Sequence, residues 1–564
     1  DFAKRYFYTV KNVPKSIQDV FTIEKKGNTF RVFVLGGSSA AGYPFMPLGS
    51  FSRYVRRRLE LTYPNTNIEV MNVSLTAVNS FTIRDIIPDV LTQSPDLILI
   101  YAGHNEYYGA LGIGSMESLG KSRTMVNFLL GVNNYKTTQL IRNSIKWSLK
   151  QISSDNKNSK GTLMSRMAEE QSIPYNSELF YLGIEQFEGN MTDALAMIAE
   201  AKVPVILSTL VSNLKDQPPF ISKVNKLHPY PKANKVFTEA KKELQLGNIN
   251  IADSLFRFAK ELDHLRFRAP NKVNDALLRL SEKYKTPIVK ADSLLNLYSP
   301  QNIIGDNLMV DHLHFNLKGY QLLGKVFFNV MNKNNYLPRT KKAIPHNQQD
   351  SITISNYIFS ELDSTISDFK ISLLKNDWPF VNQRNKKDAS TITHLNNYID
   401  TLAYRFVNGK EEWEKVHRTL AVTYFGNDQF EKGKKEIDLL IHQYPTVVEY
   451  QNFISNELVT RKRFDEALSY LDKGYQLKPD YFFCKWLGII YLSKNKFETS
   501  IKYLEESLTY KKDDAQVLYN LSGAYAKSKK FAKALKNINK CLSISPNYNG
   551  AKILKGQLEI LVIK

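Results

Sequence analysis

Three short polar segments, far apart in the chain, carry side chains that together could transfer an acyl group. Gly36–Ser39 presents a serine in a turn of small residues, and Gly103–Glu106 presents an asparagine. Asp311–His314 supplies a carboxylate and two imidazoles. A serine hydroxyl is a poor nucleophile at neutral pH and needs an adjacent base. Histidine suits that task because its neutral form is available near pH 7.

The residue types suggest a role for each of these side chains. His314 is the candidate base, and Asp311 is placed to fix its tautomer and to stabilise the imidazolium ion that forms. Asn105 offers a side-chain N–H to the oxyanion, and loss of one such donor typically costs about 100- to 1000-fold in rate. His312 is the other candidate for the base. Because it directly follows Asp311 in the chain, we expect its side chain to point away from that carboxylate. The pattern requires neither a metal nor another cofactor.

Each segment alone has a simpler interpretation. Gly36–Gly42 could be a phosphate-binding turn, although it contains neither a P-loop lysine nor a GxGxxG pattern. Asn105 and Asp311 could be helix caps, and a single His314 could be structural. Their joint occurrence, in this order along the chain, favours the catalytic interpretation.

The elements that must position these residues alternate between strand and helix over the first 340 residues. Ligands of parallel sheets with crossover helices bind at the carboxyl ends of the strands. Ser38 and Asn105 each follow a predicted strand, so we expect them at one edge of such a sheet. Strand-like runs cover 31–35, 68–73, 97–102, 203–208 and 287–290, and helical periodicity covers 51–63, 83–91, 187–201, 273–284 and 317–330.

At these segments the chain resembles the SGNH/GDSL serine hydrolase superfamily, over about residues 30–335. The resemblance implies a three-layer α/β/α, flavodoxin-like fold that hydrolyses or transfers acyl esters through a serine intermediate. It implies that Ser38, Asp311 and His314 are catalytic, and that Ser38, Ala77 and Asn105 donate to the oxyanion.

Two positions depart from the pattern of that superfamily. Asn72–Ala77 matches a further conserved segment of that superfamily, which ends in a glycine where this chain has Ala77. An alanine at this position allows fewer backbone angles than a glycine. Gly37 replaces an aspartate that is not part of the triad.

Substrate contacts are predicted for five residues, namely Gly37, Tyr43, His104, Arg266 and Arg268. The two arginines flank Phe267, and paired guanidinium groups can bind a carboxylate or a phosphate. Alternatively, they pair with acidic groups across an insertion.

The predicted organisation begins with an arm over 1–30 and a hydrolase domain over 31–338. This domain contains insertions at about 107–174 and 212–270. The first insertion includes a polar run at 153–161 that predicts a mobile loop. The second predicts a helical hairpin with Gly247 and Asn248 at its turn.

Beyond residue 338 the pattern becomes all-helical. Phe430, Phe464, Phe497 and Phe531 are spaced 34, 33 and 34 residues apart, and a small residue follows three positions after each. This period resembles the tetratricopeptide repeat (TPR), with four units over 415–548 in a solenoid region of 415–564. Such repeats imply a protein or peptide partner. Residues 339–414 are a degenerate repeat or a joining helix pair.

The charge balance of 76 basic against 55 acidic residues favours anionic partners, such as an envelope polymer or a membrane surface. A lysine-biased composition spread over solvated helix faces is the simpler explanation of this excess of positive charge. Nucleic acid is set aside because no zinc-finger spacing or basic-aromatic signature accompanies the charge. Cys484 and Cys541 occupy core phases of helices. The chain opens on Asp1 without a signal peptide, as either export processing or trimming would leave it.

These observations predict a serine esterase that acts on an O-acetyl or other acyl ester of a carbohydrate, an envelope polymer or a lipid. The alternatives are an O-acyltransferase that uses a sugar hydroxyl, and an inactive scaffold that binds a partner. The expected location is the bacterial cell envelope, in the periplasm, with or without an N-terminal membrane anchor.

Overall fold

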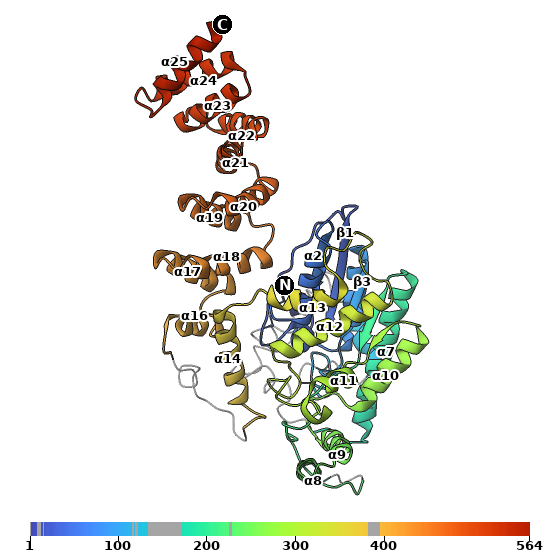
Figure 1. Cartoon of the computed structure of the whole chain (residues 1–564). Helices are drawn as coiled ribbons and strands as arrows, with labels where there is room; N and C mark the ends of the chain where they lie inside the picture. The colour runs from blue at the N-terminus through green and yellow to red at the C-terminus, as the bar shows by residue number, and fades with distance from the viewer. Residues whose placement is uncertain are drawn as a thin grey trace, which may run out of the picture. The chain divides into compact units, whose positions relative to one another are not determined.

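A computed structural model describes residues 2–7, 13–14, 16–115, 118, 122–132, 172–224, 228–381 and 395–563. The chain forms two compact units, Asp1–Val416 and His417–Lys564 (Figure 1). The polar run at 153–161 lies outside the described residues.

A five-stranded parallel sheet forms the centre of the first unit. Its strands are β1 (Thr29–Gly36), β2 (Asn67–Asn72), β3 (Leu97–Tyr101), β4 (Val205–Ser208) and β5 (Ile288–Val289). They lie in the order β2-β1-β3-β4-β5, with Val34 opposite Leu99 and Leu99 opposite Ile206. The order reverses between β1 and β3, which is the switch point where doubly wound sheets bind ligands. The predicted strands and their parallel pairing are confirmed.

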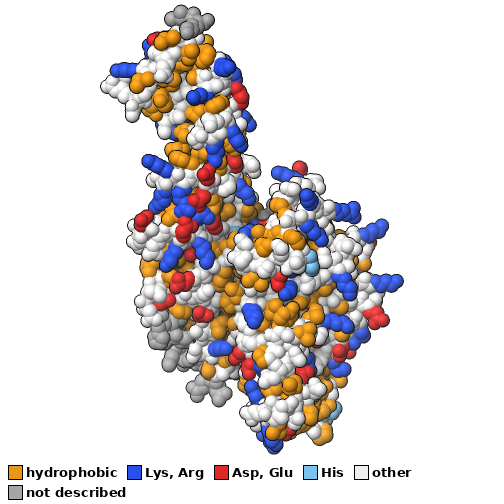
Figure 2. Space-filling model, viewed as in Figure 1, with side chains coloured by type: hydrophobic (Ala, Val, Ile, Leu, Met, Phe, Trp, Pro, Cys, Tyr) orange, Lys and Arg blue, Asp and Glu red, His pale blue; other side chains and the backbone are white. Residues whose placement is uncertain are grey.

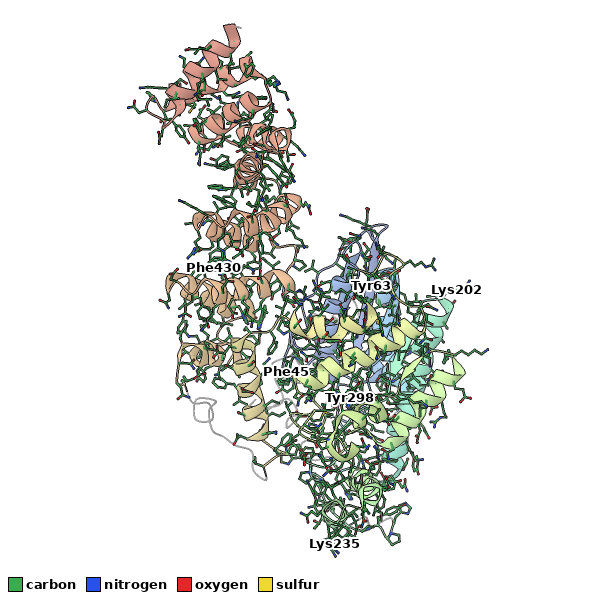
Figure 3. The ribbon with its side chains drawn as sticks, in the orientation of Figure 1. Phe45, Tyr63, Lys202, Lys235, Tyr298 and Phe430 are labelled. Atoms are coloured by element: carbon green, nitrogen blue, oxygen red, sulfur yellow. The ribbon has the colours of Figure 1, made fainter. Side chains whose placement is uncertain are left out.

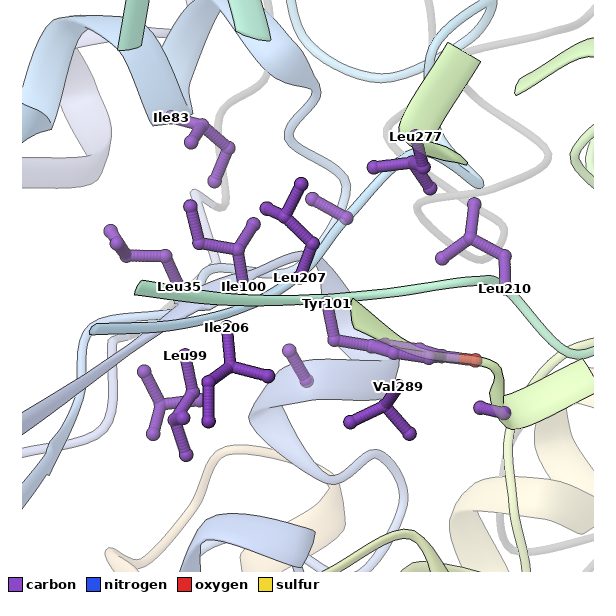
Figure 4. Packing of buried hydrophobic residues seen from close by; sticks show 14 of the residues in the cluster. Leu35, Ile83, Leu99, Ile100, Tyr101, Ile206, Leu207, Leu210, Leu277 and Val289 are labelled. Carbon is purple, nitrogen blue, oxygen red and sulfur yellow. The ribbon is translucent and has the colours of Figure 1, made fainter. Parts of the chain in front are cut away.

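Helices cover both faces of this sheet. Alternate strand residues point to opposite faces, so Ile100 and Leu207 lie on one side while Leu99 and Ile206 lie on the other (Figure 4). On the first side pack α3 (Ser80–Thr92), α7 (Glu178–Glu200) and α10 (Asn271–Lys283), and on the second α2 (Phe51–Thr62) and α12 (Leu317–Lys333). Short helices α11 (Ala291–Leu294), η2 (Leu295–Tyr298) and η3 (Pro300–Asn302) join β5 to the loop before α12.

The described parts of the arm and the insertions add further helices. The arm contains η1 (Phe2–Arg5), where Arg5 and Tyr6 both bind Asp85 of α3 at 2.7 Å. The first insertion contains α4 (Arg123–Val132). The second contains α8 (Ala233–Gln245) and α9 (Ile249–Leu262), which pack as the predicted hairpin. Gly247 at its turn adopts φ +84°, which favours glycine.

The described part of the first unit also contains α13 (His346–Ser355), α14 (Glu361–Lys375) and α16 (Tyr398–Val407). α14 packs against α16, and a capping box fixes its first turn at Ser360. The loop that follows the first strand and its short helix packs on this segment through Phe45 (Figure 3), whose ring lies 5.9 Å from that of Phe359. The Trp413 indole also donates to the Asp363 carboxylate at 2.9 Å.

The second unit consists of paired helices. They begin with α17 (Trp413–Gly426), which starts in the first unit, and continue as α18 (Phe430–Gln443), α19 (Val448–Thr460), α20 (Phe464–Leu477), α21 (Tyr481–Ser493), α22 (Phe497–Tyr510), α23 (Ala515–Lys527), α24 (Phe531–Ile544) and α25 (Ala551–Ile563). Each periodic phenylalanine is the first residue of the second helix of a pair, as Phe430 shows in Figure 3.

The small residues of the repeat mark positions where helices approach closely. Ala467, Ser500 and Ala534 are fully buried, and the Ser500 hydroxyl donates to the Gly488 carbonyl across the α21–α22 pair at 2.8 Å. Both cysteines are buried and free, as their helical phase predicted.

Lysine and arginine side chains are scattered over the face of the molecule seen in Figure 2 and mixed with acidic ones. This distribution is what a lysine-rich composition spread over solvated helices produces. Within the described parts of the chain, no helix is both long and apolar enough to cross a membrane.

Candidate active site

Ser38 lies just beyond the carboxyl end of strand β1, beside the central strand β3. β1 finishes at Gly36, and Ser38 opens the short helix α1 (Ser38–Ala41), with Gly37 as its N-cap. Gly42 closes the helix at φ +95°, where a Cβ atom would lie 2.5 Å from that of Ser50. The N–H groups at the start of a helix have no intrahelical partner, so this strand-turn-helix arrangement presents both the Ser38 hydroxyl and its backbone N–H.

The structure brings Ser38, His314 and Asp311 into one hydrogen-bonded chain. Ser38 Oγ lies 2.7 Å from His314 Nε2, and His314 Nδ1 lies 2.6 Å from Asp311 Oδ2. A proton on Nδ1 donates to the carboxylate, which leaves the Nε2 lone pair facing the serine hydroxyl. This is the connectivity that a Ser-His-Asp triad requires.

Asp311 also builds the turn that carries His314. Its Oδ1 accepts the backbone N–H groups of Leu313 at 2.9 Å and His314 at 2.8 Å. Burial by itself raises the pKa of such a carboxyl group, but the attraction of the His314 imidazole, which also donates a hydrogen bond, and of the nearby His312 ring outweighs this effect. The pKa of Asp311 therefore lies well below its usual value, and the carboxylate stays ionised at neutral pH.

Asn105 lies in the loop after β3, the neighbour of β1 in the sheet, and lines the same cavity as Ser38. A Cβ atom at Gly37 would lie only 2.7 Å from Asn105 Nδ2, so the glycine leaves room for this amide. Ala77 lines the same cavity as Ser38 and Asn105. Its φ of +58° lies in the left-handed region that favours glycine, so the alanine occupies a glycine-like conformation at this position.

Glu106 anchors the turn that carries Asn105. It is fully buried, and its two carboxyl oxygens accept the Ser80 hydroxyl at 2.6 Å and the Ser80 N–H, at the start of α3, at 3.1 Å. Burial raises the pKa of Glu106 to about 7, although the hydrogen bonds from Ser80 oppose the shift. The side chain therefore titrates in the folded protein near neutral pH.

This shift predicts a pH-dependent stability. Between about pH 4.5 and about pH 7 the folded protein holds a proton on Glu106 that the unfolded chain releases, so stability falls as the pH rises through this window. The total loss is up to about 3 kcal/mol, at 1.36 kcal/mol per pKa unit. Glu106→Gln should remove this contribution. Urea unfolding at about pH 5 and about pH 8 should therefore show a smaller pH-dependent change for the variant than for the wild type; equal changes would contradict it.

A cavity of about 310 Å³ opens onto the triad. Tyr43 lies against His314, with ring centroids 4.7 Å apart, and is among the residues that line this cavity. Part of its wall comes from α14 and α16, which contain none of the predicted site residues. The lining residues are Ser38, Tyr43, Thr76, Ala77, Asn105, Tyr108, Phe267, His312, Leu313, His314, Lys370, Leu373, Leu374 and Val407.

His312 is placed differently from His314. Its Nδ1 lies 3.4 Å from Asp311 Oδ1, and among the described residues neither of its ring nitrogens has a hydrogen-bond partner. The ring packs edge-on against Phe220 at 5.3 Å. Burial lowers the pKa of His312, so it forms an uncharged wall of the cavity.

Two predicted substrate contacts, Arg266 and Arg268, need correction. Both side chains are buried and do not line the cavity, although Phe267 between them does. Arg266 donates to the carbonyls of Ile173 and Glu261. Arg268 donates to two other carbonyls and pairs with Asp263 at 3.3 Å. The guanidinium group of Arg268 therefore ties together parts of the second insertion, and that of Arg266 also joins this insertion to Ile173 of the first. The pairing of Arg268 with Asp263 agrees with the alternative interpretation.

His104 and Gly37 also differ from the prediction that they contact substrate. His104 is buried beside a small cavity of about 10 Å³ behind Ser38, where its Nδ1 accepts the Ala269 N–H at 3.3 Å. Burial lowers its pKa to about 3, so the ring is neutral. Gly37 contributes by leaving space for Asn105 rather than by lining the large cavity.

A tetratricopeptide-repeat family model matches residues 486–514 and 515–548. The C-terminal helices are tetratricopeptide repeats. Two Hsp70-Hsp90 organising proteins, from Plasmodium falciparum and from its isolate 3D7, are each 36% identical over 75 residues, or 13% of this chain. The chain spans only 30% and 13% of these relatives.

Two solved structures illustrate the low similarity of the structural matches. A structure titled YrrB, a TPR protein with an unusual peptide-binding site, is 13% identical, with a TM-score of 0.26 over 29% of this chain and 84% of that one. MamA from Desulfovibrio magneticus RS-1 is 16% identical, with a TM-score of 0.25 over 27% of this chain and 85% of that one. The repeats form a protein-interaction region.

Proposed function

We propose that the first unit is a serine esterase of the SGNH/GDSL type, with Ser38 as nucleophile. The observation that carries this proposal is the hydrogen-bonded chain from Ser38 Oγ through His314 to Asp311, with distances of 2.7 and 2.6 Å. The strand order 2-1-3-4-5, with helices on both faces, agrees with the flavodoxin-like fold that this resemblance implies.

In this proposal Ser38 Oγ attacks the acyl carbonyl of an ester while His314 Nε2 takes the hydroxyl proton. The negative charge that develops on the carbonyl oxygen faces the Asn105 amide and the backbone N–H groups of Ser38 and Ala77. His314 then protonates the departing alcohol, which leaves an acyl group on Ser38. Water, activated by the same imidazole, releases the acid and restores the serine.

The oxyanion role of Asn105 predicts the effect of Gly37→Ala. The Gly37 backbone has φ −90°, which alanine tolerates, so the added methyl group should act mainly by displacing the Asn105 amide. Loss of one such donor lowers kcat by about 100-fold. We expect a fall of this size in ester hydrolysis, with an unchanged melting temperature.

Gly27→Ala is the matched control, because a Cβ atom there meets nothing within 4 Å. Asn105→Ala should reproduce the kinetic defect of Gly37→Ala, and the double variant should be no slower than either one. Additive losses in the double variant would show that Gly37 acts independently of Asn105.

The acceptor of the acyl group decides between an esterase and an O-acyltransferase. Release of p-nitrophenol from an activated ester should be observed in buffer alone, because water suffices in our proposal. Release that begins only when a sugar acceptor is added would favour the transferase instead. The two activities share the same fold and the same acyl-serine intermediate, and they differ only in the acceptor.

We further propose that the repeats bind a protein or peptide and so bring the catalytic unit to its site of action. The relatives named above carry Hsp70 and Hsp90 in their names, and a C-terminal chaperone peptide is therefore a defined ligand to test. Titration of the full chain with such a peptide, followed by calorimetry, tests this class of partner directly.

A further inference from the structure

The walls of the catalytic cavity are mostly apolar once the triad and Asn105 are set aside. Phe267 and Leu313 line the cavity together with His314. The helices α14 and α16 add three further apolar side chains, namely Leu373, Leu374 and Val407. The imidazole of His312 adds an uncharged surface, because burial lowers its pKa. A cavity of this composition favours a hydrocarbon ligand, since burial of apolar surface drives its binding.

The α14–α16 wall is fixed to the loop that follows Ser38. The Ser367 hydroxyl lies 3.4 Å and the Lys370 ammonium 3.3 Å from the Pro44 carbonyl oxygen, to which both donate. The Tyr43 hydroxyl donates to the Lys370 carbonyl at 3.4 Å. Burial lowers the pKa of Lys370 to about 8, so its ammonium group carries its charge less readily than a solvated one.

The volume of the cavity bears on the size of the acyl group. At about 310 Å³ the cavity falls in the range of small-molecule sites. An acetyl group bound to Ser38 would leave most of it unfilled. A linear chain of several methylene groups could instead extend from the serine toward Leu373 and Val407, and each added methylene would lose contact with water.

We propose that the site takes esters of linear, medium-length fatty acids in preference to acetyl esters, and that Leu373 and Val407 determine the accepted chain length. This inference rests on the proposed esterase function and specifies its substrate class. Both side chains are partly exposed, so larger residues can replace them without overpacking the core.

The test uses the full chain with p-nitrophenyl acetate, butyrate, hexanoate and octanoate. We expect kcat/KM to rise with chain length, by up to about fourfold per methylene until the cavity is filled. Leu373→Trp and Val407→Trp should each lower kcat/KM for the octanoate at least about tenfold, while hydrolysis of the acetate stays within about twofold. Lys375→Trp is the control, because this residue is exposed on the same helix.

The outcomes separate this proposal from the one on which it rests. Hydrolysis that depends on Ser38 but is fastest for the acetate, and is indifferent to both tryptophan variants, would overturn the substrate class and leave the esterase intact. Equal losses for all four esters would show that α14 and α16 support the triad rather than select the chain, and would also overturn it. If no ester of any length is hydrolysed, both proposals fail.

Discussion

Ser38→Ala should lower ester hydrolysis by on the order of 10⁵- to 10⁶-fold, the loss seen when a triad serine is removed. The Ser38 hydroxyl lies 2.7 Å from His314 Nε2, and in our account it forms the covalent bond to the acyl group. Alanine removes this oxygen and leaves the helix start and the backbone N–H in place. Steady-state kinetics with p-nitrophenyl butyrate, together with a thermal melt, measures the effect.

Ser39→Ala is the matched control for this experiment. Ser39 is the adjacent residue of α1 and is equally buried, but its hydroxyl donates to the Leu313 carbonyl at 3.1 Å instead of to the imidazole. We expect a change of less than about tenfold, since one neutral hydrogen bond contributes only about 1 kcal/mol. Residual hydrolysis of comparable size in Ser38→Ala and Ser39→Ala would mean that another group performs the attack.

Asp311→Asn should lower kcat by about 10⁴-fold without unfolding the protein. The Asn oxygen can still accept the N–H groups of Leu313 and His314, which keeps the turn intact. Its NH₂ group would then face His314 Nδ1 and force that nitrogen to accept. The ring proton would then lie on Nε2, and this nitrogen could no longer accept the proton of the Ser38 hydroxyl.

Asp306→Asn provides the comparison, because Asp306 is an exposed carboxylate of the same loop. It should leave kcat nearly unchanged. Asp311→Ala should lower both kcat and the melting temperature, since two backbone N–H groups of a buried turn lose their acceptor. A full-rate Asp311→Asn variant would show that the carboxylate serves the turn alone.

The sheet and the polar cluster could be predicted from the sequence because their signals are local. Val32–Leu35 and Leu97–Ile100 are uninterrupted apolar runs. Ser38 follows the first run by three residues, and Asn105 follows the second by five. Parallel strands place their carboxyl ends at one edge, so Ser38 and Asn105 had to meet. The periodic phenylalanines likewise mark the starts of helices, because each repeat has the same internal packing.

The walls of the cavity could not be predicted in this way. Leu373, Leu374 and Val407 lie on amphipathic helices whose apolar faces are indistinguishable in sequence from any core-facing surface. Their place beside His314 depends on tertiary contacts such as those of Pro44 with Ser367 and Lys370. The predicted roles of Arg266 and Arg268 were wrong for a related reason, since backbone carbonyl acceptors leave no pattern in a sequence.

The most direct test of the central claim is covalent trapping of the full chain with a fluorophosphonate probe. Such probes react with a serine that an adjacent imidazole activates. We predict one phosphonyl group per chain, which peptide mass spectrometry should locate on Ser38. Ser38→Ala should take no label, and the labelling of Asp311→Asn should be strongly slowed. A folded protein that takes no label, or one whose label lies on a different residue and survives Ser38→Ala, would contradict the account.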